Sequence, residues 1–148
     1  MAKNSRAVAA EVIYKLVRGS GSLTTHLQEA RSRPDYQLIQ ELTFGTCRWY
    51  EQLSFFLESL LEKPLKSKDS DIHSLLLIGL YQLRYMRVPD HAAINETVNA
   101  ARDLKKPWAK ALTNAVLRNY LREQEALEMG LESAPPHQRA ARSGRRTG

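Results

Sequence analysis

The chain has 148 residues, of which 43% are hydrophobic, and this is enough apolar material for one compact domain with one core. The longest apolar run, residues 75 to 80, is far shorter than the roughly 20 residues that cross a bilayer, and the N-terminus lacks the apolar segment of a secretory signal, so we expect a cytoplasmic protein without a membrane span. The net charge of +6 favours a polyanionic partner, while the single cysteine excludes an internal disulfide.

The first half of the chain predicts three helices. Residues 4 to 18 place their apolar side chains on one face at helical spacing, which predicts an amphipathic helix. Gly19 and Gly21 end this helix, and Ser22 is the predicted N-cap of a second, shorter one. After Pro34, the apolar positions of residues 36 to 62 fit one long helix, with Gly45 as the position where it could kink or break.

Prolines divide the second half. Pro64 ends the long helix, and a polar loop at 66 to 70, with Asp69 or Ser70 as cap, precedes the central helix, whose residues 73 to 86 are so apolar that most sides should be covered. Further helices are predicted from 91 to about 105, capped by Asp90, and from Pro107 to about Met129, ended by Gly130. No segment alternates with period two. The sequence therefore predicts an all-α domain over residues 4 to 130, with six or seven helices packed as a bundle.

The positive charge is divided evenly between the predicted domain and its tail. Residues 131 to 148 hold four arginines against one glutamate and contribute +3, so residues 1 to 130 contribute the other +3. The domain is only mildly basic, and the placement of its cations matters more than their number. Pro135, Pro136 and many small residues predict that 131 to 148 form a disordered arginine-rich tail, which is either a non-specific nucleic-acid arm or a solvated terminus.

Four motifs resemble a known family. They are ELTFGTCR at 41 to 48, IGLYQL at 78 to 83, PDHAAINETV at 89 to 98 and LTNAVLR at 112 to 118. In order and spacing they resemble the helices of NusB-like domains, and most of all the N-terminal RNA-binding domain of the bacterial small-subunit rRNA cytosine-5 methyltransferase (RsmB/Sun) family. The resemblance spans roughly residues 4 to 126. It implies a NusB-like bundle that contacts RNA, with small-subunit rRNA as the partner.

The catalytic half of that family has no counterpart in these residues. The family's enzyme continues with an S-adenosylmethionine-binding α/β domain that carries two catalytic cysteines, whereas this chain has Cys47 alone and no Gly-rich turn for such a cofactor. Cys47 lies between Phe44 and Trp49 without a histidine nearby and is predicted to be a core residue. His73 and His91 have no nucleophile beside them. The sequence predicts no catalytic residue, no metal site and no cofactor in this chain.

Nine basic residues are the predicted RNA contacts: Lys3, Arg6, Lys15, Arg18, Arg48, Lys105, Lys106, Lys110 and Arg118. The resemblance implies the first four, since the basic N-terminal segment and nearby helix ends form the nucleic-acid face of NusB-like proteins. Structural roles remain open for others. Lys105 and Lys106 end a helix and would favour its dipole, while Arg48 and Arg118 could pair with acidic residues. Trp108 and Tyr120 are the aromatic residues predicted to reach the surface and stack on unpaired bases.

Three functions follow from these predictions. The leading hypothesis is an rRNA-binding domain that positions its RNA for a methyltransferase domain, either covalently linked or separate. A second is a NusB-type antitermination factor that regulates transcription by binding nascent RNA together with a small ribosomal protein. The third is a helical module that binds proteins or dimerises.

Overall fold

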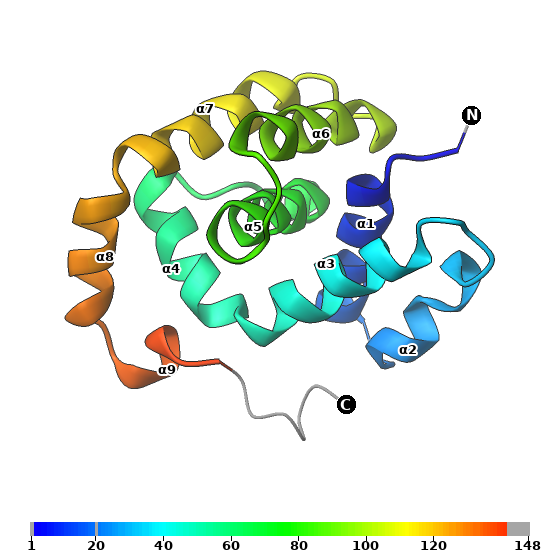
Figure 1. The fold of residues 1–148 in the computed structure, drawn as a ribbon, viewed down its shortest axis with the longest axis horizontal. Coiled ribbons are helices and arrows are strands. Elements are labelled where there is room, and N and C mark those ends of the chain that lie inside the picture. The colour runs from blue at the N-terminus through cyan, green and yellow to red at the C-terminus, as the bar shows by residue number, and fades with distance from the viewer. Residues whose placement is uncertain (1, 20, 142–148) are drawn as a thin grey trace.

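The computed structural model describes residues 2–19 and 21–141, and all regular structure within them is helical (Figure 1). This confirms the all-α prediction. Helices of nine residues or more in these ranges are α1 (Ser5–Arg18), α3 (Tyr36–Arg48), α4 (Tyr50–Leu60), α5 (Ser70–Tyr85), α6 (Asp90–Asp103), α7 (Ala109–Arg122) and α8 (Gln124–Glu132). Shorter elements are α2 (Leu23–His26), α9 (Pro136–Arg139) and two 3-10 turns, η1 (Gln28–Ala30) and η2 (Ser67–Asp69).

Helix α5 is the centre of the bundle, as its apolar sequence predicts. Figure 1 shows it in the middle of the molecule, and it packs against α1, α3, α4, α6 and α7. Residues 74 to 82 are all buried. Gly79 lies where α5 meets α7, because a Cβ atom there would come within 2.8 Å of the Leu117 methyl groups. A residue without a side chain therefore allows these two helices to approach closely.

The long helix predicted over 36 to 62 is broken at Trp49, not at Gly45. Gly45 lies inside α3, where a Cβ atom would stand 2.1 Å from the ring of Tyr81, so the glycine makes room for that ring. Trp49 separates α3 from α4, and its own ring stacks on Tyr85 with centroids 4.7 Å apart. The break therefore brings α4 across the end of α5 with an aromatic cluster at the corner.

The helix ends differ from the predictions in detail. Ser22 does cap α2, since its hydroxyl accepts from the backbone N–H of Thr25 at 3.2 Å. Asp69 precedes α5 without a capping hydrogen bond, and Asp90 is the first residue of α6. The helix predicted from Pro107 to about Met129 is divided at Glu123 into α7 and α8.

Ordered structure extends further than composition predicts. Gly130 lies inside α8, and beyond it Leu131 and Ala134 are buried. Gln52 Nε2 of α4 donates to the backbone oxygen of Arg139 at 2.9 Å, which fastens α9 to α4. Of the tail predicted to be disordered, residues 131 to 148, the part from 131 to 141 thus packs on the bundle, and residues 142 to 148 lie outside the described residues.

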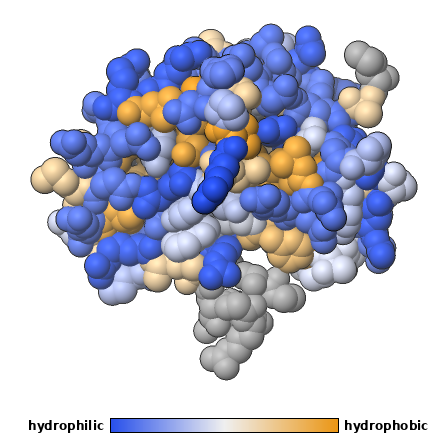
Figure 2. All heavy atoms as spheres, in the orientation of Figure 1, coloured by the Kyte–Doolittle hydropathy of each residue, from blue (hydrophilic) through white to orange (hydrophobic). Residues whose placement is uncertain are grey.

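One face of the surface is drawn in Figure 2, in the orientation of Figure 1. Hydrophilic residues predominate on it, and hydrophobic residues appear as separate patches between them. Within residues 2–19 and 21–141, no helix combines the length and the apolar character needed to span a membrane.

Candidate nucleic-acid interface

The C-terminal end of α1 lies beside the loop that leads into α5. Arg18 Nη1 donates to the backbone oxygen of Ser67 at 3.2 Å and to its hydroxyl at 3.1 Å. At the other end of α1, Arg6 Nε donates to Gln82 Oε1 at 3.0 Å. Helices α1 and α5 are therefore antiparallel. Arg18, which is exposed, lies near the N-terminal end of α5, whereas Lys15 lines a hollow on another side of α1 together with Glu11 and Glu29.

The connection between α6 and α7 reaches the same loop. Lys106 Nζ donates to the backbone oxygen of Lys68 at 2.7 Å and forms ion pairs with Asp69 (3.2 Å) and Asp71 (2.7 Å). Burial lowers the pKa of Lys106, but the hydrogen bonds to Asp71 and Asp69 outweigh it and the pKa is raised. Residues 61 to 69 are therefore held by Arg18 through Ser67 and by Lys106 through Lys68.

Exposed cations from three segments gather around this loop. We call them the basic end: Arg18, Lys63, Lys66, Lys68 and Lys105. Lys106 is paired with both Asp69 and Asp71 and offsets one of their two negative charges, so the cations of the basic end outnumber the carboxylates beside them. Glu62 is the exposed acidic residue of the loop. The arrangement brings exposed cationic groups to one end of the bundle, which suits a phosphate-rich ligand.

Among the residues of the basic end, Lys105 has an unusual backbone conformation. Its φ angle is +64°, which places a non-glycine residue in the left-handed region. The N–H of Lys105 donates to Arg102 O at 2.8 Å, and that of Lys106 donates to Ala101 O at 3.0 Å. These two bonds form a Schellman motif, in which glycine usually occupies the position of Lys105. The motif ends α6 and leaves the Lys105 side chain exposed.

Two of the predicted RNA contacts are placed unfavourably for that role. Arg6 is 8% exposed, and a buried chain runs from its Nε through Gln82 to Thr97 Oγ1 at 2.8 Å. Burial lowers the pKa of Arg6, against the attraction of Glu96. The prediction that Arg6 contacts RNA is therefore corrected: this arginine joins α1, α5 and α6. Lys3 is exposed, but it is paired with the Glu11 carboxylate at 2.8 Å.

The remaining predicted contacts are distributed over other surfaces. Lys106, in the connection between α6 and α7, contacts the loop but is paired with Asp69 and Asp71. Arg48 is exposed at the end of α3, close enough to Tyr81 to lower its pKa against the larger effect of burial, which raises it. Lys110 and Arg118 share one face of α7, where Arg118 Nε donates to Asn114 Oδ1 at 3.0 Å. Of the nine predictions, Arg18 and Lys105 lie together in the basic end, and Lys15 lies on another side of α1, in a hollow that Glu11 and Glu29 also line.

The two aromatic predictions have opposite outcomes. Trp108 is 53% exposed, as predicted for a residue at the start of α7. Tyr120 is fully buried, with its ring edge-on to Phe56 at 5.7 Å and its hydroxyl 3.5 Å from Arg84 Nη1. The prediction that Tyr120 reaches the surface is wrong, because Tyr120 shares the inward face of α7 with Thr113, Val116 and Leu117.

Trp108 lines a groove next to the basic end. The groove lies between the loop after α4 and α7, and has a volume of about 680 Å³. Its apolar lining includes Leu61, Leu65 and Leu112, and its charged lining includes Lys63, Lys66, Lys68, Glu62 and Asp69. A large exposed indole is thereby placed in a hollow that carries three lysines.

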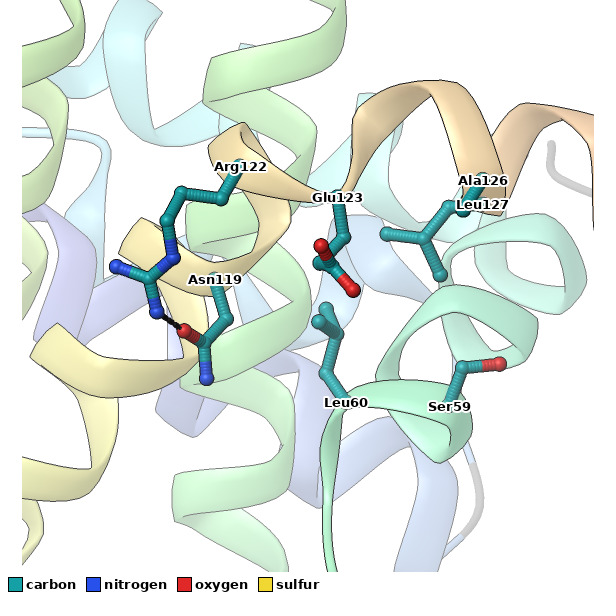
Figure 3. A pocket seen from close by; sticks show the side chains of 7 residues that line it. All are labelled: Ser59, Leu60, Asn119, Arg122, Glu123, Ala126 and Leu127. Atoms are coloured by element: carbon teal, nitrogen blue, oxygen red, sulfur yellow. Dashed lines mark hydrogen bonds between the residues drawn. The ribbon is translucent and has the colours of Figure 1, made fainter.

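A second hollow adjoins the first and is seen in Figure 3. Leu60 and Asn119 line both, and the second has a volume of about 470 Å³. Arg122 extends toward Asn119 and donates to its Oδ1, while Glu123 and Leu127 lie on the side of α8. The two hollows together form a continuous depression from Trp108 to Arg122.

Lys63, Lys66 and Lys68 are the interface residues that sequence reasoning missed. They lie in a segment interpreted only as a loop that ends one helix and caps the next. The available signal was three lysines within six residues of an exposed connection. Their significance depends on α1 and the α6–α7 connection reaching the same loop, which is a tertiary feature.

The described residues also include the side chains considered for catalysis or metal binding. Cys47 is 7% exposed and belongs to the core, as predicted. His73 is half-buried near Glu58, and burial lowers its pKa against the opposing effect of that carboxylate. Between residues 2 and 141, apart from residue 20, no three histidine, cysteine or acidic residues are grouped as metal ligands.

The sequence comparisons define the class of protein first. The model of the NusB family matches residues 3–122, and the chain belongs to that family. It is 50% identical to the ribosomal RNA small subunit methyltransferase B of Pseudomonas syringae pv. tomato, over 89% of this chain and 30% of that protein. For the proteins of the same name from Pseudomonas putida and Vibrio vulnificus, identities are 47% and 49%, over 89% and 84% of this chain.

The match covers most of this chain but only a smaller part of each relative. The chain spans about 30% of the length of the curated relatives it matches, in their N-terminal region. The resemblance noted from the four motifs is thus confirmed, both for the NusB-like domain and for the methyltransferase family in which it occurs.

Proposed function

We propose that this domain binds small-subunit rRNA through the basic end and positions it for a methyltransferase domain, linked or separate. The observation that carries the proposal is the gathering of Arg18, Lys66, Lys68 and Lys105 around one loop of a NusB-family bundle. The relatives' name, ribosomal RNA small subunit methyltransferase B, supplies the class of RNA. Affinity would come from phosphate contacts, and sequence or shape would be read elsewhere.

The methyl transfer itself is assigned to another domain. Methylation at cytosine C5 needs a cysteine thiolate that can reach the base and add to its ring, and Cys47 is packed in the core at 7% exposure. The residues that reach solvent in this domain are suited to holding RNA. We therefore propose RNA as its ligand and a methyltransferase domain as its partner.

The salt dependence of RNA binding tests the proposal. About four phosphate contacts, each with a slope of roughly 0.7 for single strands, would lower the affinity for an rRNA fragment roughly 50-fold between about 50 and 200 mM salt. A variant combining Lys63→Gln, Lys66→Gln and Lys68→Gln removes three of these cations, and its slope should fall by about 2. Fluorescence anisotropy with a labelled fragment measures both quantities.

The matched control removes the same charge elsewhere. Arg31→Gln, Arg87→Gln and Arg139→Gln change three exposed cations outside the basic end. This variant should keep nearly the parental affinity and slope. Equal losses in the two triple variants would mean that RNA senses only the net charge, and the proposed interface would be rejected.

The antitermination hypothesis is less well supported. Family membership is compatible with it, but the relatives described above are named for rRNA methylation. Copurification with a small ribosomal protein on nascent RNA would instead favour the transcription factor. A protein partner bound in the absence of any RNA affinity would favour the helical interaction module.

A further inference from the structure

We infer that the groove beside Trp108 holds an unpaired RNA base, stacked on the indole, with its phosphate against the lysines of the loop. The inference rests on the proposed function and adds to it a nucleotide subsite. It assigns a role to an exposed aromatic side chain that neither the core nor the basic end requires.

Trp108 is held in a defined position although half of it is exposed. It follows Pro107, and the turn around it is closed by Ala109 N–H to Lys106 O at 2.9 Å and Lys110 N–H to Pro107 O at 3.1 Å. The same connection is fixed to the loop by the Lys106 ion pairs. The indole is therefore presented from a rigid turn, which limits the ordering required when a base stacks on it.

The charge of the groove favours a nucleotide. Lys63, Lys66 and Lys68 face two carboxylates, and one of these, Asp69, is paired with Lys106 at 3.2 Å. A nucleotide has an apolar face for the indole and a phosphate for the ammonium groups, so it matches both parts of the lining. The volume of about 680 Å³ is within the range of small-ligand sites.

The adjoining hollow indicates the path that the bound strand would follow across the surface. From Trp108 the depression passes Asn119 and reaches Arg122, whose guanidinium is oriented by its hydrogen bond to the Asn119 amide (Figure 3). Arg122 is exposed and positively charged, and it can contact the phosphate of a following nucleotide. An acidic peptide would also attract the lysines, but it does not account for a flat, exposed indole.

The two tryptophans allow a direct test. Trp49→Phe leaves Trp108 as the sole tryptophan and retains an aromatic ring against Tyr85. Single-stranded RNA of about six nucleotides should quench the Trp108 emission saturably, because a stacked base quenches the indole. A blunt RNA duplex of the same sequence should leave the emission nearly unchanged, since its bases are already stacked.

A second variant separates stacking from electrostatics. Trp108→Leu keeps an apolar residue at this exposed position and should lower the affinity for single strands by roughly ten-fold, with the salt slope unchanged. Trp108→Phe should restore part of the loss. Lys66→Gln with Lys68→Gln should weaken the quenching titration and reduce the slope, whereas Arg31→Gln with Arg87→Gln should not. Thermal unfolding checks that each variant folds.

The outcomes distinguish the subsite from the proposed function. Salt-dependent RNA binding with unchanged Trp108 emission, and parental affinity in Trp108→Leu, would reject the subsite and leave the basic end intact. Absence of RNA binding altogether would reject both. Saturable quenching by an acidic peptide but not by RNA would make the groove a protein-binding site and overturn the inference.

Discussion

The two ends of the central helix α5 differ in how their cationic side chains are paired and exposed. At the C-terminal end of α5, Arg84 forms an ion pair with Glu128 and donates to Gln52 Oε1 at 2.9 Å, and its guanidinium lies 4.9 Å from the Phe56 ring centroid. Its side chain is 18% exposed. At the N-terminal end, the lysines of the basic end are exposed, and Lys106 offsets one of the two negative charges of Asp69 and Asp71. Positive charge therefore stabilises the fold at one end and remains accessible to a ligand at the other.

The C-terminal end of α5 shows why net charge alone does not identify a phosphate-binding surface. Burial lowers the pKa of Arg84, yet hydrogen bonds to Glu128, Tyr120 and Tyr85 outweigh that effect, so its pKa is raised and the group stays charged. Gln52 connects this cluster to α9 through Arg139. Because these partners already occupy the guanidinium of Arg84, few of its N–H groups remain to bind a phosphate.

The largest expected effect is at Arg84. Arg84→Met removes the ion pair and the hydrogen bond to Gln52 while keeping an apolar stem over Phe56, and should lower the free energy of unfolding by roughly 2–3 kcal/mol. This figure allows for Glu128, whose side chain is 43% exposed. Urea unfolding measures it. RNA affinity of the folded variant should be unchanged, and loss of binding without loss of stability would contradict the division between the two ends.

A neighbouring arginine supplies the control. Arg87 follows α5 by two residues and is exposed, so Arg87→Met should change the free energy of unfolding by no more than about 0.5 kcal/mol. A similar loss in both variants would mean that charge near this end, not the Arg84 cluster, is what matters.

Lys105 should respond in the opposite sense for stability and binding. Lys105→Gly relieves the left-handed backbone and should raise the free energy of unfolding by about 1 kcal/mol, while RNA affinity falls several-fold with the loss of one cation. Lys105→Arg retains both the charge and the strain and should change neither quantity much. Thermal unfolding and anisotropy titrations give the two readings. A glycine variant that is less stable would show that the lysine side chain contributes contacts to the fold.

The sequence predicts the fold because hydrophobic periodicity is a local property. The apolar run of α5 and the cap at Ser22 are readable from a few neighbouring residues, and both are confirmed. The burial of Tyr120 was readable as well, since Thr113, Val116 and Leu117 precede it at helical spacing on one face. Arg6 is similar, because it precedes Ala9, Ala10 and Ile13 at the spacing of the buried face of α1.

The binding site is harder to predict because it depends on distant pairings. Lys106 is neutralised by Asp71, which is 35 residues away in the chain, and neither position indicates the pairing by itself. Arg18 reaches Ser67 across 49 residues. The break at Trp49 and the packing of Leu131 and Ala134 likewise arise from contacts between elements, and not from local propensity.

The smallest expected effect is the pH dependence of the free energy of unfolding that His73 causes near the basic end. His73 borders a hollow formed with Glu58, Leu61 and Lys63, and burial, partly opposed by the charge of Glu58, lowers its pKa. The folded state therefore favours the neutral imidazole, and its full stability is present above the unfolded pKa of about 6.5 and decreases as the pH falls below that value. Between about pH 7 and 5 this should amount to less than about 1 kcal/mol in urea unfolding, and His73→Gln should remove it. The difference between parent and variant is the quantity to compare, and an unchanged difference across the range would show that His73 is hydrated in both protonation states.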